Sequence, residues 1–271
     1  MSPEPGEQST AGRYTVQSVA RALDILEIIA KSRDGLTLTE IARKIGISKS
    51  ATYSLLRTLV DKAHVREVAA GPRYQLGVGL LKLADIALTQ LSLGELAKPI
   101  LTGLSESLGM TTRLAIAEDG QPVFIDRVDG PGTVRFHTPM GKRELAHASA
   151  AGKAVLACLP EAKVRAVCAE YGMAKRTSHT IVTVKALLAN LELARSRGFA
   201  TDDEEDADGV FCVGAAFFDH RGECAGAISA TFIKFDVSAD RIEEIGMATR
   251  AGADQVSALL GGPAYPERNT L

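Results

Sequence analysis

The chain has 271 residues, of which 46% are hydrophobic and 24% charged, with a formal net charge of −2. This composition excludes a globally disordered chain, and the length favours one large domain or two ordinary ones. No apolar run approaches the roughly 18–20 residues of a membrane helix, and the four cysteines form no CxxC pair, so we expect a cytoplasmic protein with free thiols and no membrane segment.

The charges are unevenly distributed along the chain. Residues 1–90 carry 12 Lys and Arg against 9 Asp and Glu, whereas the rest carries 19 against 24. From Arg43 to Arg66, six basic residues stand against a single acid, Asp61. A basic stripe on a small N-terminal unit suits a polyanion such as DNA, and a solvated helix surface is the alternative.

The first 77 residues carry the pattern of a winged helix-turn-helix. Apolar spacing predicts, in chain order, helices over 16–31, 40–45 and 49–63 and strands over 65–68 and 73–76. Thr39 and Ser48 are expected to cap the second and third helices, and Gly46 to end the second. Two helices around a short turn, followed by a hairpin that turns at residues 70–72, are the order of this fold. We place the domain at residues 15–77, after a disordered tail over 1–14.

The rest of the chain mixes helices and strands without an internal repeat. The patterns predict helices over 77–90, 93–108, 152–158, 161–171, 184–197 and 238–260, the last capped by Ser238, and strands over 112–117, 122–128, 133–136, 210–218 and 224–235. We assign residues 78–92 to a linker helix, 93–262 to a second domain and 263–271 to a flexible tail. The mixture favours an α+β domain with an antiparallel sheet, and hence a two-domain α+β protein.

The third predicted helix offers side chains that suit base edges. The first turns of a recognition helix reach the bases, and we expect its exposed face to carry Lys49, Ser50, Thr52, Tyr53 and Arg57. Lys and Arg bond guanine acceptors, and Ser and Thr bond several bases. Ser48 and the N–H groups at the helix start suit a phosphate. Arg66 and Arg73 flank the hairpin, within reach of the DNA backbone or a minor groove.

Two segments of the second domain suit a small anion. The small residues around Ala151 expose N–H groups at a helix start, which is a natural seat for a carboxylate. Ser229 and Thr231 share one face of their strand, because side chains two apart point the same way. A buried cysteine such as Cys212 is by itself more typical of a packed core. Together these features predict a ligand pocket formed by Ala150, Ala151, Gly152, Asp202, Cys212, Ser229 and Thr231.

No metal or cofactor is expected from the sequence. The acidic run over 202–208 imitates the start of a calcium loop, but the twelfth position is Ala215 instead of Glu. His147 and Cys212 belong to no pair with the spacing of zinc ligands. Nothing in the sequence supplies an activating base for the Cys212 thiol, so we do not expect an enzyme.

Several stretches resemble the IclR family of bacterial transcriptional regulators. VQSVARALDIL, LTLTEIARKIGISKSATYSLLRTL and RYQLGVGLLKLA resemble its DNA-binding half, and HASAAGKAVLA and GFATDDEEDADGVFCVGAAFFDHRGECAGAISAT resemble its effector-binding half. The resemblance spans about residues 16–260. It implies a winged helix-turn-helix, a linker helix and a GAF-like domain, in dimers or tetramers on palindromic operators. It also implies that the Ala150–Gly152 loop binds an acid group and that Asp202, Cys212, Ser229 and Thr231 match effector residues.

The sequence therefore predicts a ligand-responsive regulator, namely a repressor of a catabolic operon that binds double-stranded operator DNA and a small organic or aromatic carboxylate. Three alternatives stay open. They are an activator of the same pathway, a thiol-dependent enzyme that uses Cys212 and Asp202, and a sensor or scaffold with a vestigial DNA-binding domain. The basic third helix favours the regulator, because an enzyme does not need it. One departure from the family, Ser54 where an Arg is common, affects the expected operator sequence.

Overall fold

The computed structural model describes residues 15–68, 72–90, 92–136, 140–236 and 238–265. Its contacts divide the chain into two units, Met1–Leu91 and Ser92–Leu271. Each unit has a hydrophobic core of its own. The predicted two-domain α+β class is confirmed.

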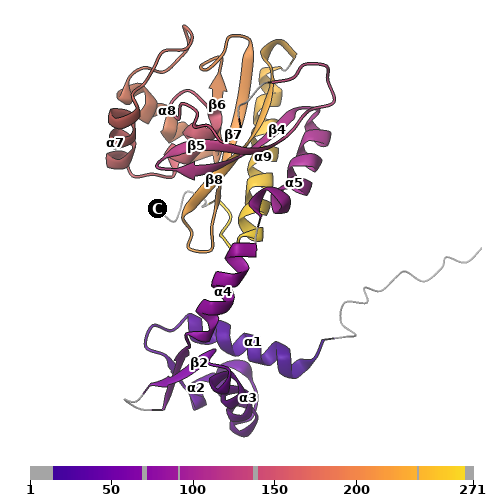
Figure 1. Ribbon diagram of the computed structural model, residues 1–271, viewed down its shortest axis with the longest axis vertical. Helices are drawn as coiled ribbons and strands as arrows, with labels where there is room; N and C mark the ends of the chain where they lie inside the picture. The colour runs from indigo at the N-terminus through magenta and orange to yellow at the C-terminus, as the bar shows by residue number, and fades with distance from the viewer. Residues whose placement is uncertain (1–14, 69–71, 91, 137–139, 237, 266–271) are drawn as a thin grey trace, which may run out of the picture. The chain divides into compact units, whose positions relative to one another are not determined.

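The first unit consists of helices packed against a small antiparallel sheet (Figure 1). Its elements are α1 (Gln17–Ala30), β1 (Leu36–Thr37), α2 (Leu38–Ile45), α3 (Lys49–Asp61), β2 (Val65–Val68), β3 (Arg73–Leu76) and α4 (Gly79–Gln90). The sheet order is β1-β3-β2. Ile25 and Ile29 of α1, Ile41 of α2 and Leu56 of α3 meet in the core. The helix-turn-helix and hairpin strands are thus confirmed, and β1 is an additional short strand.

Thr37 caps α2, and the prediction of Thr39 was wrong. The N–H of Glu40 donates to Thr37 Oγ1 at 3.3 Å, while the N–H of Thr37 donates to the Glu40 carboxylate at 2.8 Å. This reciprocal capping box needs Glu or Gln three residues after the cap, and Thr39 is followed by an alanine at that distance. Gly46 ends α2 at φ +76°, as predicted, and Ser48 caps α3.

The second unit is a five-stranded antiparallel sheet with helices on both faces (Figure 1). Its elements are α5 (Leu93–Leu108), β4 (Thr111–Glu118), β5 (Gln121–Val128), α6 (Ala150–Ala157), α7 (Glu161–Tyr171), α8 (Val184–Arg197), β6 (Ala200–Asp203), β7 (Val210–Phe218), β8 (Cys224–Ile233), the 3₁₀ helix η2 (Lys234–Asp236) and α9 (Ala239–Leu259). The strand order is β5-β4-β8-β7-β6. Helices α5 and α9 share one core with the sheet, and α6, α7 and α8 share the other.

Three details of the second unit differ from the predictions. Residues 133–136 form no strand, and the side chain of Arg135 donates instead to the nearby carbonyls of Gly132 and Val134. Strand β6 was missed, since its four residues show no clear apolar alternation. Ser238 precedes α9, but its side chain makes no capping hydrogen bond.

The predicted domain boundaries at residues 14, 77, 92 and 262 remain predictions. The division by contacts falls at residues 91 and 92 and leaves α4 in the first unit. The tail over 1–14, part of the hairpin turn and residues 266–271 lie outside the described residues. Within the predicted C-terminal tail, the N–H of Tyr265 donates to Asp254 at 2.7 Å, and its ring packs 5.9 Å from that of Phe218.

Candidate nucleic-acid interface and ligand cavity

Helix α3 presents polar side chains along its exposed side. Lys49, Ser50 and Tyr53 are exposed, and the hydroxyl oxygens of Ser48 and Ser50 lie 3.1 Å apart. Arg57 pairs with Asp61 one turn later at 3.4 Å, but both side chains stay more than half exposed. Such a pair is weak in water, so the Arg57 guanidinium remains accessible to an anion.

Thr52 does not belong to this exposed side, and its predicted exposure was wrong. Its side chain is fully buried, and Oγ1 donates to the carbonyl of Ser48 at 3.0 Å. Thr52 lies one turn before Leu56 and two turns before Leu59, so all three share the face that packs into the core. A buried hydroxyl that is already hydrogen-bonded is not available to read a base.

The two arginines of the hairpin have different surroundings. Arg66 is exposed and donates to the side chain of Gln75 at 2.6 Å. Arg73 donates to the carbonyl of Gly35 at 2.7 Å and lies 3.8 Å from the Glu40 carboxylate. Arg73 therefore ties β3 to the start of α2, whereas Arg66 is the better placed of the two for an outside partner.

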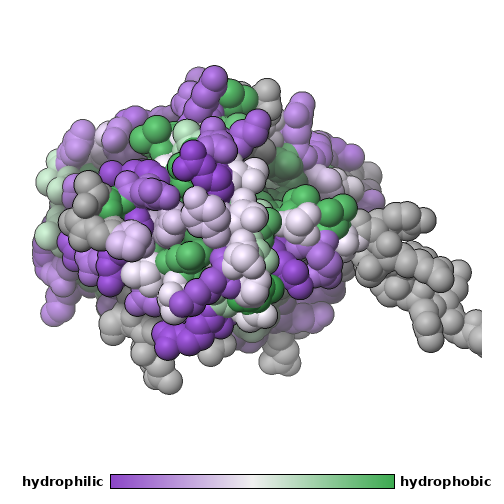
Figure 2. Space-filling model, turned by 90° about the horizontal axis from the view of Figure 1, so that it is seen from below, coloured by the Kyte–Doolittle hydropathy of each residue, from purple (hydrophilic) through white to green (hydrophobic). Residues whose placement is uncertain are grey.

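Apolar side chains also reach the surface of the first unit. Val19 and Leu23 of α1 are 57% and 56% exposed, and the exposed Val16 at the N-cap lies one turn before Val19. The buried residues of this helix, Ile25 and Ile29, lie on a different side of it. Figure 2 shows hydrophobic patches among hydrophilic side chains. An exposed apolar stripe is typical of a protein contact surface.

The second unit contains a cavity of about 270 Å³. It is lined by Arg113, Phe124, Arg135, Phe136, Glu144, Ser149, Ala150, Ala151, Asp202, Asp206, Ala207, Val210, Cys212 and Ser229. Five of the seven predicted pocket residues lie among them, namely Ala150, Ala151, Asp202, Cys212 and Ser229. Residues far apart in the sequence thus meet at one small cavity.

Strand register places the polar floor of the cavity on one face of the sheet. Cys212 of β7 lies opposite both Asp202 of β6 and Thr231 of β8, and Ser229 of β8 lies opposite Arg113 of β4. Directly opposite residues of antiparallel strands point to the same face. The acid, the thiol, the hydroxyls and the guanidinium therefore share the face that α6 covers.

Gly214 lets α6 begin close to the sheet. A Cβ at this position would stand 2.6 Å from the carbonyl oxygen of Ala150 and 2.8 Å from the nitrogen of Ala151. All eight residues of α6 are buried. Ala150 and Ala151 are the first two residues of this helix, where N–H groups have no partner within the helix. The absent side chain of Gly214 thus brings these N–H groups to the cavity.

Gly152 and Thr231 lie beside the cavity and do not line it. The N–H of Gly152 donates to Ser149 Oγ at 3.2 Å, so the cap of α6 already uses it. Thr231 Oγ1 lies 3.3 Å from Cys212 Sγ, and Thr231 lines a neighbouring cavity of about 360 Å³. Burial raises the pKa of Cys212 to about 12. Its sulfur is therefore a neutral thiol at physiological pH and a poor nucleophile.

Two carboxyl groups of the cavity titrate near neutral pH. Burial raises the pKa of Asp202 to about 7, against the opposing effect of the Glu205 N–H, which donates to it at 2.7 Å. Burial also raises the pKa of Glu144 to about 7, although the Arg113 charge opposes this shift. The cavity can therefore adjust its charge to its occupant by binding or releasing protons.

A buried ion pair supports the acidic side of the cavity. Lys153 of α6 contacts the Glu205 carboxylate through Nζ, and neither side chain is exposed. Glu205 Oε2 has no hydrogen-bond partner among the described residues. Burial raises the pKa of Glu205, and the Lys153 charge opposes this shift. Because the Glu205 backbone also bonds Asp202, the ion pair fixes the turn after β6 against α6.

Sequence reasoning missed Arg113, Glu144 and the two phenylalanines. Arg113 is 8% exposed, and its guanidinium carbon lies 5.5 Å from the ring centroid of Phe124. An arginine in an otherwise apolar strand was a usable signal, because burying a charge is costly without a partner or a purpose. Glu144 and Phe136 come from the irregular stretch between β5 and α6, where no periodicity predicts which side chains turn inward.

The described residues contain neither a metal-binding cluster nor a membrane-spanning helix. Among the described residues, no group of three or more His, Cys, Asp and Glu side chains is placed to hold a metal ion. No helix in the described part of the chain is long and apolar enough to cross a membrane.

Comparison with known proteins identifies relatives of the whole chain. Residues 86–258 match the family described as bacterial transcriptional regulator IclR C-terminal, and residues 18–68 match the IclR helix-turn-helix domain. Transcriptional repressor IclR of Escherichia coli is 34% identical, covering 96% of this chain and 95% of the relative. The acetate operon repressor of Salmonella typhimurium is 33% identical over 91% of both chains. The crystal structure of Agobacterium tumefaciens repressor BlcR matches with a TM-score of 0.76 and 27% identity, covering 92% of this chain and 98% of that one.

Proposed function

We propose that this chain, which belongs to the IclR family of bacterial transcriptional regulators, represses a catabolic operon and responds to a small organic or aromatic carboxylate. The relatives are DNA-binding regulators and not enzymes. The observation that carries the proposal is the cavity, which combines helix-start N–H groups with a serine hydroxyl in a chain that also holds an exposed, basic helix-turn-helix. The Salmonella relative is named for an acetate operon, which agrees with a role in the use of a small acid.

For DNA binding, we propose that α3 enters the major groove of a palindromic operator. Lys49, Ser50, Tyr53 and Arg57 would face base edges, and Ser48 and Arg66 would face phosphates. A palindrome requires two copies of the reading helix. The exposed stripe of Val16, Val19 and Leu23 supports a homodimer or homotetramer, because pairing would cover it.

Lys49→Ala is expected to weaken operator binding by about 1–3 kcal/mol, the typical cost of losing a base contact. Lys49 is exposed at the first position of α3, so its removal leaves the core intact. The measurement is fluorescence anisotropy with DNA that the full-length protein selects from a random library, followed by the same titration with random DNA. Two-fold symmetry in the selected sequences would support the oligomer.

Lys62→Ala is the matched control for Lys49→Ala. Lys62 is also exposed, but it follows the last turn of α3. The control removes the same charge from the far end of the helix, so it measures the nonspecific electrostatic loss alone. Equal losses for the two variants on selected and random DNA would contradict base reading by Lys49.

Ser229→Ala is expected to weaken binding of the effector by about 1–3 kcal/mol, because a buried polar group of the ligand loses its partner. Ser229 lines the cavity, and none of the hydrogen bonds among the described residues uses its hydroxyl. A thermal-shift screen of small organic and aromatic acids identifies the ligand, since binding to the native state raises Tm. Calorimetry then compares the variant with the wild type. If no acid raises Tm, the proposed effector class is contradicted. If the variant and the wild type bind the acid with equal affinity, Ser229 is not part of the binding site.

A further inference from the structure

Arg113 is a buried cation of the cavity that makes no ion-pair contact with a described acid, although its charge acts on Glu144. Its Nε has no hydrogen-bond partner, and no ion pair or hydrogen bond between described residues involves its guanidinium. The Phe124 ring lies 5.5 Å from the guanidinium carbon. An aromatic ring contacts the flat face of a guanidinium and leaves its N–H edge available for a planar anion.

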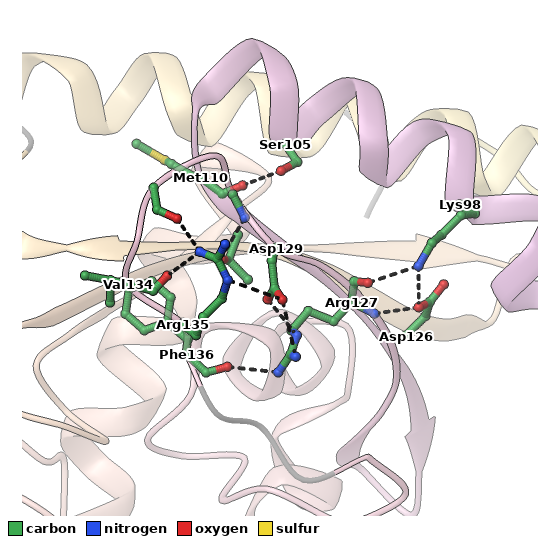
Figure 3. Close-up of polar contacts among 12 residues, drawn as sticks. Lys98, Ser105, Met110, Asp126, Arg127, Asp129, Val134, Arg135 and Phe136 are labelled. Carbon is green, nitrogen blue, oxygen red and sulfur yellow. Dashed lines mark hydrogen bonds and ion pairs between the residues drawn. The ribbon is translucent and has the colours of Figure 1, made fainter.

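The other cations near the cavity have ion-pair partners, although the exposed pairs of Arg135 and Arg176 are weak in water. Arg135 and Arg127 converge on Asp129 at 3.8 and 2.8 Å, and Arg135 also donates to backbone carbonyls (Figure 3). Arg176 pairs with Asp206 at 3.2 Å, and Lys153 pairs with Glu205. Within the described part of the chain, Arg113 is therefore the arginine of the cavity that an anionic ligand reaches without breaking an ion pair.

The remaining lining limits the charge of such a ligand. Glu144, Asp202 and Asp206 all line the same cavity. The Oδ1 atom of Asp202 accepts N–H groups from Glu205 and Asp206 at 2.7 and 3.4 Å, so its other oxygen is the one left to accept from a ligand. When they are ionised, acceptors of this kind suit a hydroxyl or ammonium donor and repel a second carboxylate. The volume of about 270 Å³ lies just below the roughly 300–1,000 Å³ of pockets for drug-sized ligands.

We propose that Arg113 holds the carboxylate of the effector, and that the acids lining the cavity restrict the effector to a small monocarboxylate that also carries a hydroxyl or ammonium group. This inference rests on the effector-binding function proposed above and specifies which chemical class of effector the cavity selects. The N–H groups of Ala150 and Ala151 complete the seat for the carboxylate, and Ser229, opposite Arg113 in the sheet, supplies a hydroxyl.

The test begins with Arg113→Met, which removes the charge and keeps a long side chain. Without ligand, this variant is expected to have a higher Tm than the wild type, because an unpaired buried charge is lost. With the acid that binds best in the thermal-shift screen, Kd is expected to rise about 10- to 150-fold, the loss of a hydrogen bond to a charged group. Arg113→Lys keeps the charge without the two-pronged geometry and is expected to restore part of the affinity.

Ligand pairs test the predicted chemical class. The probes are lactate, lactamide and malate, together with 4-hydroxybenzoate and its amide and the best acid of the screen with its own amide. For each hydroxy monocarboxylate that binds, we expect the corresponding amide to bind much more weakly. We also expect malate to bind more weakly than lactate. Tighter binding of the dicarboxylate would overturn the restriction to one carboxylate.

The outcomes separate the failure of this inference from that of the proposed function. If acids bind wild type and lose affinity with Ser229→Ala but not with Arg113→Met, the cavity is the effector site and the role of Arg113 is overturned. If ligand-free Arg113→Met has a lower Tm than the wild type but binds the acid with unchanged affinity, Arg113 stabilises the fold and does not bind the effector. If no acid binds wild type, the proposed effector class fails, and this inference fails with it.

Discussion

Lys153→Met is expected to lower the free energy of unfolding by about 3–5 kcal/mol, because it leaves Glu205 buried without its partner. The loss should depend on pH. Burial holds the pKa of Glu205 above its ordinary value, and the Lys153 charge, which opposes this shift, is gone in the variant. An acid with a raised pKa in the folded state takes up protons on folding, so its contribution to stability falls as pH rises from the unfolded pKa to the folded one. The variant should therefore lose less stability at about pH 5.5 than at about pH 8.

Urea unfolding followed by circular dichroism at both pH values measures this effect. The control is the double variant Lys153→Met and Glu205→Leu, which removes both charges and is expected to recover most of the lost stability. If the double variant is as unstable as the single one, or if the loss in unfolding free energy is the same at both pH values, the packing around Lys153 determines the stability and the ion pair does not.

Gly214→Ala is expected to destabilise the protein by about 3 kcal/mol, at the upper end of the usual cost of overpacking. The new Cβ would meet the backbone of Ala150 and Ala151 at 2.6–2.8 Å, and backbone cannot rotate away as a flexible side chain does. The start of α6 must therefore shift, and the N–H groups at the cavity shift with it. Affinity for the effector should fall together with stability, which calorimetry and thermal unfolding measure on the same sample.

Gly103→Ala is the matched control. Gly103 lies in α5, is exposed, and has nothing within 4 Å of the position of a new Cβ. The substitution should stabilise the protein by up to about 1 kcal/mol, because Ala is the better helix former. If both glycine variants changed stability by the same amount and in the same direction, close approach at Gly214 would not be the cause.

Much of the fold was predictable where local signals agree. Helices α7 and α8 and strand β7 have the bounds that the sequence predicts. Pro160 precedes α7, and Gly172 and Gly198 end α7 and α8, so these three boundaries are marked by residues with restricted or unusual backbone freedom. Strand β6 was missed because it forms through pairing with β7, which its own residues do not indicate. Residues 133–136 were wrongly predicted as a strand, although Arg135 makes only local contacts with the carbonyls of its own loop.

The residues of the cavity that were predicted correctly also lie where local sequence patterns are clear. Ser229 and Cys212 lie on strands with clear patterns, and both line it, as predicted. Arg113 and Glu144 were missed because their inward placement depends on the pairing of β4 between β5 and β8 and on the irregular course after β5. Thr52 is a different kind of error, since its helical spacing to Leu56 and Leu59 was readable from the sequence alone.

The complete burial of α6 has a consequence for the thermodynamics of ligand binding. A helix without exposed residues opens only when the surrounding structure unfolds, so the N–H groups of Ala150 and Ala151 keep their positions whether or not a ligand is present. Binding therefore costs little conformational entropy for ordering this wall of the cavity. Such preorganisation lets a compound with few atoms bind tightly, and it leaves any rearrangement on binding to the irregular stretch that contributes Arg135, Phe136 and Glu144.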